Sequence, residues 1–305
     1  MDVPLPSRSA SLRGYLICGL ATAIWSTTAI FIADLNTRHG LPPLVLAFWR
    51  DLFVVLGLGA GLALIRPAWL RLPDLRRRWP FFAAYGLTLA IFNALWTTSV
   101  TLNGAAVATV LIYSSPAITT VLERYLFGER LNRFRILALA LSLMGCVLTS
   151  GAYAPSTWRL NPLGLVVGLA SGAAFSAYSL FGRATQREGL PPWTATLYAF
   201  ASATAFLALL QRPATLFWLG SALDGWAVLL LLALVPTIGG YGLYNVSLAY
   251  LPAGVANLIV TLEPVMTGIL AFLFLGERMT VVQLLGGAMI LSGVFLLQAG
   301  EGRSG

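Results

Sequence analysis

Three ionisable residues stand inside long apolar stretches of this sequence: Arg50, Asp51 and Glu263. An ionised side chain in a hydrocarbon environment costs at least ~2.5 kcal/mol on membrane-insertion scales, so such residues are usually functional. One histidine and two cysteines are too few for a histidine cluster or a thiolate metal site. The chemistry to expect is therefore that of carboxyl and guanidinium groups, and we expect no metal site, no cofactor and no catalytic residue.

Glu263 is the strongest single candidate. It lies about ten residues into the apolar run 253–275, roughly 15 Å along a helix and near the middle of a membrane. Burial without a partner would favour the neutral acid and make Glu263 a proton-coupling group, whereas a nearby arginine would hold it ionised in a structural pair. The sequence leaves both interpretations open.

Arg50 is the one cation expected at depth, in the apolar run 43–65. We predict that it has a structural role or positions a substrate. Asp51 follows it directly and therefore points to a different face of a helix. For Asp51 we expect solvation at the membrane interface.

Aromatic, amide and hydroxyl side chains recur at helical spacing in the same apolar runs. Aromatic walls with a few polar groups suit a small amphiphilic substrate with an apolar or aromatic side chain. The alternative is that some of these aromatics belong to belts at the membrane interfaces. The predicted substrate cavity consists of Trp25, Ser26, Asn93, Trp96, Tyr113, Tyr178, Tyr241, Tyr244, Asn245, Asn257 and Glu263.

Two prolines, Pro116 and Pro264, lie near the middle of apolar runs at equivalent places in the two halves of the chain. A proline removes one intrahelical hydrogen bond and frees a carbonyl group. A hinge and a fixed kink are both consistent with this. Glycines at 164, 168 and 172, followed by Ser176, recur every four residues and predict a close contact with a neighbouring helix.

Membrane helices must position these residues. The chain has 305 residues, of which 58% are hydrophobic and 10% charged, with a mean hydropathy of +0.82; soluble proteins are about 25% charged. This composition excludes a soluble enzyme or a nucleic-acid binder. The absence of lysine excludes a phosphate-binding loop, a retinal Schiff base and a pyridoxal site. Ten apolar runs can span a bilayer: 14–34, 43–65, 80–102, 104–122, 134–150, 162–182, 193–211, 226–249, 253–275 and 281–298.

The arginines indicate the orientation of these spans. With the N-terminus inside, the cytoplasmic segments carry 14 of the 19 arginines and the outer loops carry four, the asymmetry typical of inner-membrane proteins. We therefore expect a multi-pass protein of the bacterial cytoplasmic membrane, with both termini cytoplasmic. The basic charge then reflects topology, and we expect no nucleic-acid partner.

An internal repeat organises the sequence. A shift of 148 or 149 residues aligns 40–43 with 189–192 (Gly-Leu-Pro-Pro), Pro116 with Pro264, and 128–130 with 276–278 (Gly-Glu-Arg). Five spans per half force the second half to be inverted relative to the first. We predict an all-α polytopic membrane protein in which ten transmembrane helices form two inverted five-helix repeats, 1–151 and 152–305, around a central cavity.

These features resemble the bacterial drug/metabolite transporter superfamily, in particular its ten-span EamA-type exporters. The resemblance rests on Trp25-Ser26, Arg50, the Glu263-Pro264 pair and the two Pro-containing spans that end in Gly-Glu-Arg. The Trp-Ser-Thr at 25–27 is also similar to the YddG branch of aromatic amino-acid exporters. The fourth span departs from the ninth by having Ser115 before its proline, so any acidic role is confined to one half.

The resemblance implies secondary transport of amino acids, drugs or other metabolites. We expect an exporter of small metabolites, above all amino acids including aromatic ones, driven by the substrate gradient or by proton exchange. Alternatives are export of drugs or nucleoside-like metabolites, an intramembrane lipid-modifying enzyme, and a receptor or scaffold. The expected partners are a small-molecule substrate, the lipid bilayer and protons, and a functional monomer is possible.

Overall fold

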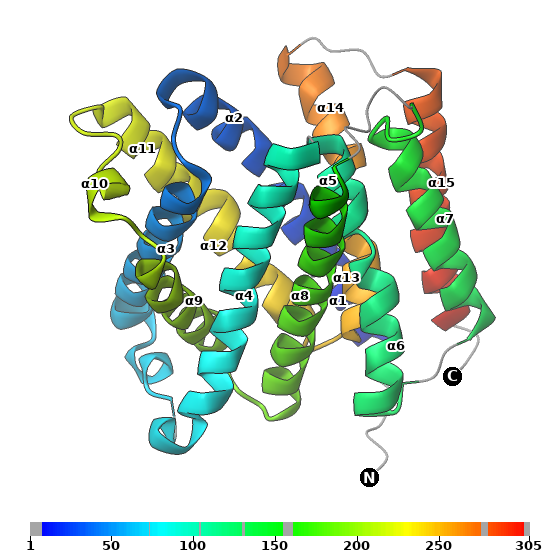
Figure 1. Cartoon of the computed structure of the whole chain (residues 1–305). Helices are drawn as coiled ribbons and strands as arrows, with labels where there is room; N and C mark the ends of the chain where they lie inside the picture. Colours follow the sequence, from blue (N-terminus) through cyan, green and yellow to red (C-terminus); the bar gives the residue numbers. More distant parts are fainter. Residues whose placement is uncertain are drawn as a thin grey trace.

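The computed structural model describes residues 8–72, 74–103, 105–129, 132–154, 161–275 and 280–301, and within these ranges the chain is helical without a strand (Figure 1). Residues up to 151 form α1 (Arg8–Trp25), α2 (Thr28–His39), α3 (Pro43–Ile65), a 3-10 turn (Pro67–Leu70), α4 (Leu75–Asn103), α5 (Ala105–Ile112), α6 (Ser115–Phe127) and α7 (Arg133–Thr149). The rest forms α8 (Pro162–Arg187), α9 (Pro192–Leu209), α10 (Pro213–Leu216), α11 (Leu223–Leu232), the π-helix η3 (Ala233–Thr237), α12 (Ile238–Ser247), α13 (Ala253–Val260), α14 (Glu263–Leu275) and α15 (Val281–Glu301).

The chain is an all-α polytopic membrane protein. Within the described ranges, seven helical stretches are long and apolar enough to cross a membrane. Large apolar side chains point outward, as lipid solvent allows: Leu64 is 85% exposed and Leu209 81%. Three predicted spans, 104–122, 134–150 and 193–211, correspond to α5 with α6, to α7 and to α9. For these three segments, membrane crossing stays a prediction. The total of ten transmembrane helices therefore also stays a prediction.

Matching turns connect the first two spans of each half. Gly40 after α2 and Gly189 after α8 adopt left-handed backbone with φ of 56° and 71°, which glycine adopts without a steric cost. Pro43 and Pro192 then open α3 and α9, where a proline lacks only an N–H that has no intrahelical partner. The repeated Gly-Leu-Pro-Pro is thus a helix stop followed by a helix start. Of the other repeat residues, Arg130 and 276–278 lie outside the described ranges.

Three of the spans predicted as single helices are interrupted, and a fourth is locally irregular. The first breaks after Trp25, and the fourth and ninth break at 113–114 and 261–262. The eighth stays continuous but loosens into the π-helix η3, which contains Pro236. Hydropathy cannot reveal such breaks, because the residues on both sides are equally apolar.

The structure changes the interpretation of Pro116 and Pro264. Each is the second residue of a new helix, α6 and α14 respectively, where its missing N–H costs nothing. The fourth and ninth spans are therefore pairs of short helices rather than kinked rods. Whether these breaks act as hinges stays a prediction.

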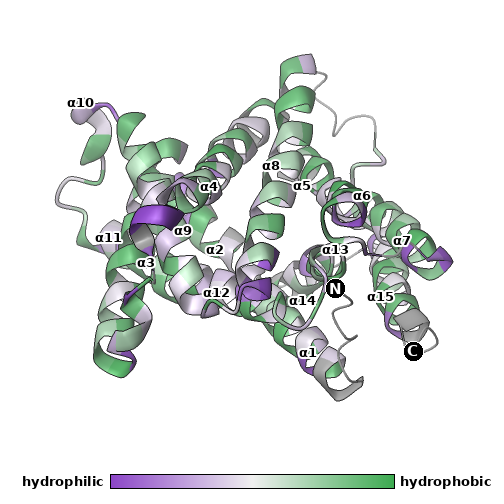
Figure 2. Ribbon diagram, turned by 90° about the horizontal axis from the view of Figure 1, so that it is seen from below, coloured by the Kyte–Doolittle hydropathy of each residue, from purple (hydrophilic) through white to green (hydrophobic). Residues whose placement is uncertain are grey.

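Many helices of one half pack against helices of the other half. Contacts of α4 with α8 have a counterpart in α12 with α1, and those of α5 and α6 with α8 in α13 with α1. Elements at equivalent positions also meet directly, α3 with α9 and α7 with α15, and α6 of the fourth predicted span contacts α13 of the ninth. The α7–α15 pair lies at one edge of the molecule (Figures 1 and 2). A Cβ on Gly145 would lie 2.6 Å from the carbonyl oxygen of Gly286, so glycine is required for this close approach.

The start of α1 and the end of α15 lie at the same end of the bundle, the lower end in Figure 1. We call it the terminal end and the opposite one the far end. The junction of α12 and α13 and the end of α6 also lie at the terminal end, whereas α14 and α5 reach toward the far end. Figure 2 views the molecule from the terminal end.

Candidate functional site

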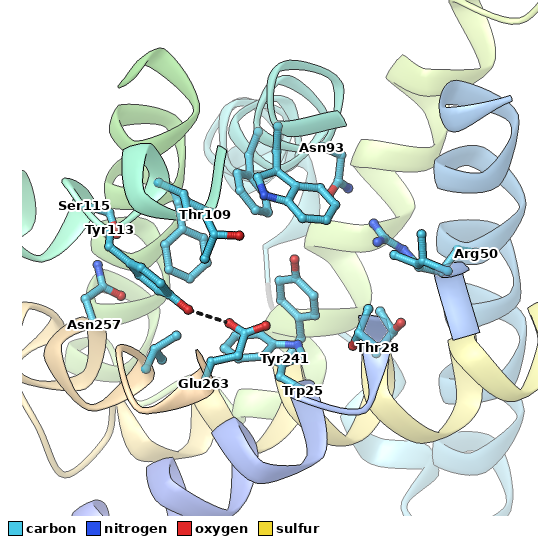
Figure 3. Close-up of a pocket in the computed structure, with 17 residues that line it drawn as sticks. Trp25, Thr28, Arg50, Asn93, Thr109, Tyr113, Ser115, Tyr241, Asn257 and Glu263 are labelled. Carbon is cyan, nitrogen blue, oxygen red and sulfur yellow. Dashed lines mark hydrogen bonds between the residues drawn. The ribbon is translucent and has the colours of Figure 1, made fainter. Parts of the chain in front are cut away.

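A cavity lies inside the bundle, between elements of both halves of the chain (Figure 3). It contains about 820 Å³ of space between atoms, counting the part open to solvent. Within the described ranges, its walls include these residues of the predicted cavity: Trp25, Asn93, Trp96, Tyr113, Tyr241, Asn257 and Glu263. Thr28, Ile32, Thr109 and Phe92 extend the lining.

Glu263 opens α14, and its carboxyl group faces the cavity (Figure 3). The hydroxyl of Tyr113 donates a hydrogen bond to Glu263 Oε2 at 3.2 Å, which is long for a hydroxyl and a carboxylate. In the part of the chain that the structure describes, no arginine lies within ion-pair distance of this carboxyl group, and Arg50 pairs with Asp51 instead. The arginine-paired alternative for Glu263 is therefore not what the structure contains.

Arg50 and Asp51 form a buried ion pair on α3, so the expectation of interfacial solvation for Asp51 is wrong. Nε and Nη2 of Arg50 donate to Asp51 Oδ1 at 3.0 and 2.9 Å. Asn93 Nδ2, from α4, donates to Asp51 Oδ2 at 3.2 Å. Asp51 is 0% exposed. Neighbouring Cβ atoms do diverge on a helix, but the long arginine side chain bends back to its neighbour and keeps the pair inside.

Aromatic rings form one wall of the cavity at the first helix break. Trp25, the last residue of α1, meets Tyr241 edge to face with ring centroids 4.7 Å apart. Phe175 of α8 packs on the same tryptophan at 6.3 Å. A Cβ on Gly240 would lie 2.4 Å from the Trp25 ring, so glycine is needed for the indole to lie against α12.

Four further residues of the predicted cavity lie behind its wall: Ser26, Tyr178, Tyr244 and Asn245, each at most 1% exposed. Asn245 Nδ2 donates to Tyr178 at 2.9 Å, and its Oδ1 accepts from Tyr85 at 3.0 Å. Ser26 donates to the carbonyl oxygen of Ala23. Such groups must find partners when buried, and here the partners are protein atoms.

Asn257 connects the cavity to the terminal end. Its Nδ2 donates to Thr119 Oγ1 of α6 at 2.7 Å, and its Oδ1 accepts from Ser179 of α8 at 3.1 Å. The Tyr244 hydroxyl donates to the same Oδ1. One amide therefore joins α13 to both α6 and α8 just below the cavity.

Glu123 is a functional candidate that the sequence analysis did not find. It is 0% exposed, and its two carboxyl oxygens accept from the backbone N–H groups of Ala253 and Gly254 at 2.5 and 2.8 Å. A side chain of α6 thus caps the start of α13, where unpaired N–H groups and the helix dipole favour a negative charge. The available signal was the Pro252 helix start opposite an acidic residue, but Glu123 falls one position beyond the predicted span 104–122.

Further polar contacts gather at the terminal end. Arg183 Nη1 donates to the carbonyl oxygen of Leu248 at 2.5 Å. Arg187 pairs with Glu129 at 3.1 Å, and Arg78 pairs with Glu188. The two ion pairs, together with Glu123 and Asn257, bind helices of the two halves to each other at this end, and the Arg183 contact joins two elements of the second half.

Comparison with known proteins identifies the family. Residues 12–151 and 162–298 each match the EamA-like transporter family. An uncharacterized transporter of Archaeoglobus fulgidus is 30% identical over 69% of this chain and 74% of its own length. A probable amino-acid metabolite efflux pump of Escherichia coli (strain K12) is 25% identical over 91% of this chain and 92% of its own.

Two more similarities are informative. The threonine/homoserine exporter RhtA of Escherichia coli (strain K12) is 27% identical over 68% of this chain and 67% of its own length. A protein of known crystal structure superposes with a TM-score of 0.75 at 21% identity, over 95% of this chain and 97% of that one, which shows the shared fold. The relatives of the present chain are named as transporters or efflux pumps, not as enzymes. This chain belongs to the EamA-like transporter family.

Proposed function

We propose that this chain is a secondary transporter that exports small metabolites, above all amino acids including aromatic ones, through the cavity of Figure 3. The observation that carries the proposal is a cavity between the two halves that has a partly buried carboxyl group, Glu263, and a buried guanidinium group, Arg50, in its walls. Aromatic rings line the cavity around these polar groups. A soluble, amphiphilic metabolite needs this mixture when it leaves water.

The names of relatives support the amino-acid class. One related protein is called a probable amino-acid metabolite efflux pump and another a threonine/homoserine exporter. Direction and substrate come to this chain by analogy, so both are part of the proposal. The similarity of residues 25–27 to the YddG branch is the reason to include aromatic amino acids.

Alternating access between two inverted halves, 1–151 and 152–305, is the proposed mechanism. The matching contacts between the halves, such as α4 with α8 and α12 with α1, support it, because two near-equivalent halves can rock about a site between them. The terminal end is held together by Glu123, Asn257 and their neighbours. In this mechanism those contacts separate when the cavity turns toward the terminal end.

The terminal end is proposed to face the cytoplasm of a bacterial cell, across the inner membrane. The arginine count of 14 against four supports this orientation. Export then begins with opening of the terminal end and finishes with release at the far end.

Glu263 is the proposed site of proton coupling. Its carboxyl group has one long hydrogen bond and, in the described part of the chain, no cationic partner. A buried carboxyl group in this setting is stable only when it is protonated or meets a cation. Exchange of a proton for a cationic group of the substrate is the coupling that this position permits.

The test is uptake of labelled amino acids into proteoliposomes that contain only this protein, with and without a pH gradient. We expect amino acids to move, and we expect an outward-directed proton gradient, with the lumen more acidic than the medium, to drive their accumulation inside the vesicles by exchange. Empty liposomes are the control. Movement of no compound in a panel of amino acids, nucleosides and cationic drugs would refute transport, and movement of drugs alone would refute the amino-acid class.

A further inference from the structure

We propose that the cavity binds an elongated zwitterion, a compound with a carboxylate at one end and an ammonium group at the other, bridging Arg50 and Glu263. Amino acids whose second amine lies at the end of the side chain and ω-amino acids belong to this class. The proposal rests on the proposed function, because it names the substrate class of the same cavity.

Arg50 is the carboxylate anchor. Its Nε and Nη2 are held by Asp51, and in the part of the chain that the structure describes its Nη1 has no hydrogen-bond partner. The guanidinium group points into the cavity (Figure 3). Guanidinium and carboxylate groups form strong charge-assisted hydrogen bonds. Asp51 and Asn93 act as positioning residues, since they fix the direction of the free Nη1.

Glu263 is the ammonium anchor. Tyr113 occupies one of its oxygens weakly, at 3.2 Å, so lone pairs remain for a donor with three N–H bonds. The rings of Trp25 and Tyr241 lie beside the carboxyl group (Figure 3). Aromatic faces attract cations, so the surroundings of Glu263 favour an ammonium group over a second anion.

The position of the two anchors selects the length of the ligand. Arg50 and Glu263 lie on opposite sides of the cavity, with the Tyr241 ring between them in Figure 3. A simple α-amino acid carries both charges on one carbon atom, whereas an elongated zwitterion carries them apart, as the two anchors lie apart in Figure 3. Between the anchors the lining is apolar at Ile32 and Phe92, which suits a methylene chain.

A pair of isomers tests this on the unmodified protein. 6-Aminohexanoate and norleucine have the same atoms and charges and differ only in how far apart the charges lie. Binding to the purified full chain in detergent is measured by calorimetry, with hexanoate and hexylamine as single-charge controls. We expect 6-aminohexanoate to bind about tenfold more tightly than norleucine and than either control, since each added charge-assisted contact in a desolvated site contributes about that factor.

Variants then assign the anchors. Glu263→Gln keeps the side-chain shape, and the double variant Arg50→Gln with Asp51→Asn removes the pair without leaving a buried charge unpaired. Each should reduce the preference for 6-aminohexanoate over norleucine to within about twofold, because one charged contact is lost. The surface pair Arg38 and Asp34, 68% and 29% exposed, gives the matched double variant Arg38→Gln with Asp34→Asn, which should keep the full preference.

Two results would overturn the inference. One is norleucine binding as tightly as 6-aminohexanoate, and the other is an unchanged preference in Glu263→Gln. Neither result affects the proposed function, which fails only if proteoliposomes move no amino acid. The isomer comparison needs no substitution, so it decides the matter even if a variant does not fold.

Discussion

The helix pairs α5–α6 and α13–α14 have the same design and different chemistry. Each is a largely apolar segment broken near its middle, and each second helix has proline at its second position. The residue before the proline is Ser115 in the first pair and Glu263 in the second. At the terminal end the acidic residue belongs to the first pair instead, because Glu123 of α6 caps α13.

This difference shows that two helix pairs of similar backbone arrangement carry their acidic residues at different places and for different roles. Shifting Glu123 by the repeat offset of 148 gives Ala271, so its capping carboxyl group is absent from the second half. The first half therefore supplies the carboxyl group that caps α13 at the terminal end, and the second half supplies the acidic group of the cavity. The following predictions, from the largest expected effect to the smallest, would break or sharpen this comparison.

Glu123→Ala should have the largest effect on stability. It leaves two buried N–H groups of α13 without acceptors, at about 1–3 kcal/mol each. A clear fall in the apparent melting temperature in detergent is expected. Glu129→Ala, which alters a partly exposed pair, is the control and should shift the melting temperature much less; equal shifts would argue against a special role of Glu123.

Gly172→Leu should damage folding before selectivity. A Cβ at Gly172 would lie 2.4 Å from Ser114 Oγ and 3.1 Å from the Ile112 carbonyl oxygen, so the side chain would collide with the break between α5 and α6. Overpacking of this kind costs about 1–3 kcal/mol. Expression yield and melting temperature measure it. Gly61 has open space around its Cβ position, and Gly61→Leu should be tolerated; normal yield of Gly172→Leu with altered substrate choice would contradict the packing role.

Glu263→Gln should reduce proton-driven transport about tenfold, the loss of one charged contact in a desolvated site. The matched change in the other half, Ser115→Ala, should keep the rate within about twofold, because a neutral hydroxyl contributes less. The readout is the transport rate in proteoliposomes as a function of pH. Equal effects of the two substitutions would remove the functional asymmetry.

Tyr113→Phe should have the smallest effect. It removes one long hydrogen bond to Glu263, worth about 0.5–1.5 kcal/mol. We expect a modest change in transport rate and a shift of its pH profile, with little change in melting temperature. An unchanged pH profile would mean that Tyr113 does not influence the protonation of Glu263.

The sequence was sufficient for the helical fold and much of the cavity wall. Hydropathy located the apolar runs, and Gly-Leu-Pro-Pro located matching turns, because both depend on local chemistry. The breaks after Trp25 and before Ser115 were not predictable, since they depend on neighbours such as Gly240 and Gly172 that are distant in sequence.

The side chains beside the cavity show the same limit. Helical spacing placed Tyr244 and Asn245 on a polar face, but only packing decides that they bond to Asn257 and Tyr178 behind the wall. Asp51 was misassigned because its burial depends on how the Arg50 side chain bends. Glu123 was missed because its partners are backbone N–H groups 130 and 131 positions away.

A reversible lock on the terminal end tests the central claim, alternating access between the halves, most directly. A Cβ built on Gly254 lies 2.5 Å from Thr120 Oγ1 and 3.1 Å from Thr120 Cα, so Thr120→Cys with Gly254→Cys brings a thiol of α6 within reach of a thiol of α13, and a disulfide that forms there holds the two Cβ atoms about 3.5–4.5 Å apart. Cys18 and Cys146, both buried, are replaced by alanine beforehand. The account predicts that oxidation stops transport in proteoliposomes and that reduction restores it. Transport at an unchanged rate with the disulfide fully formed would contradict the account.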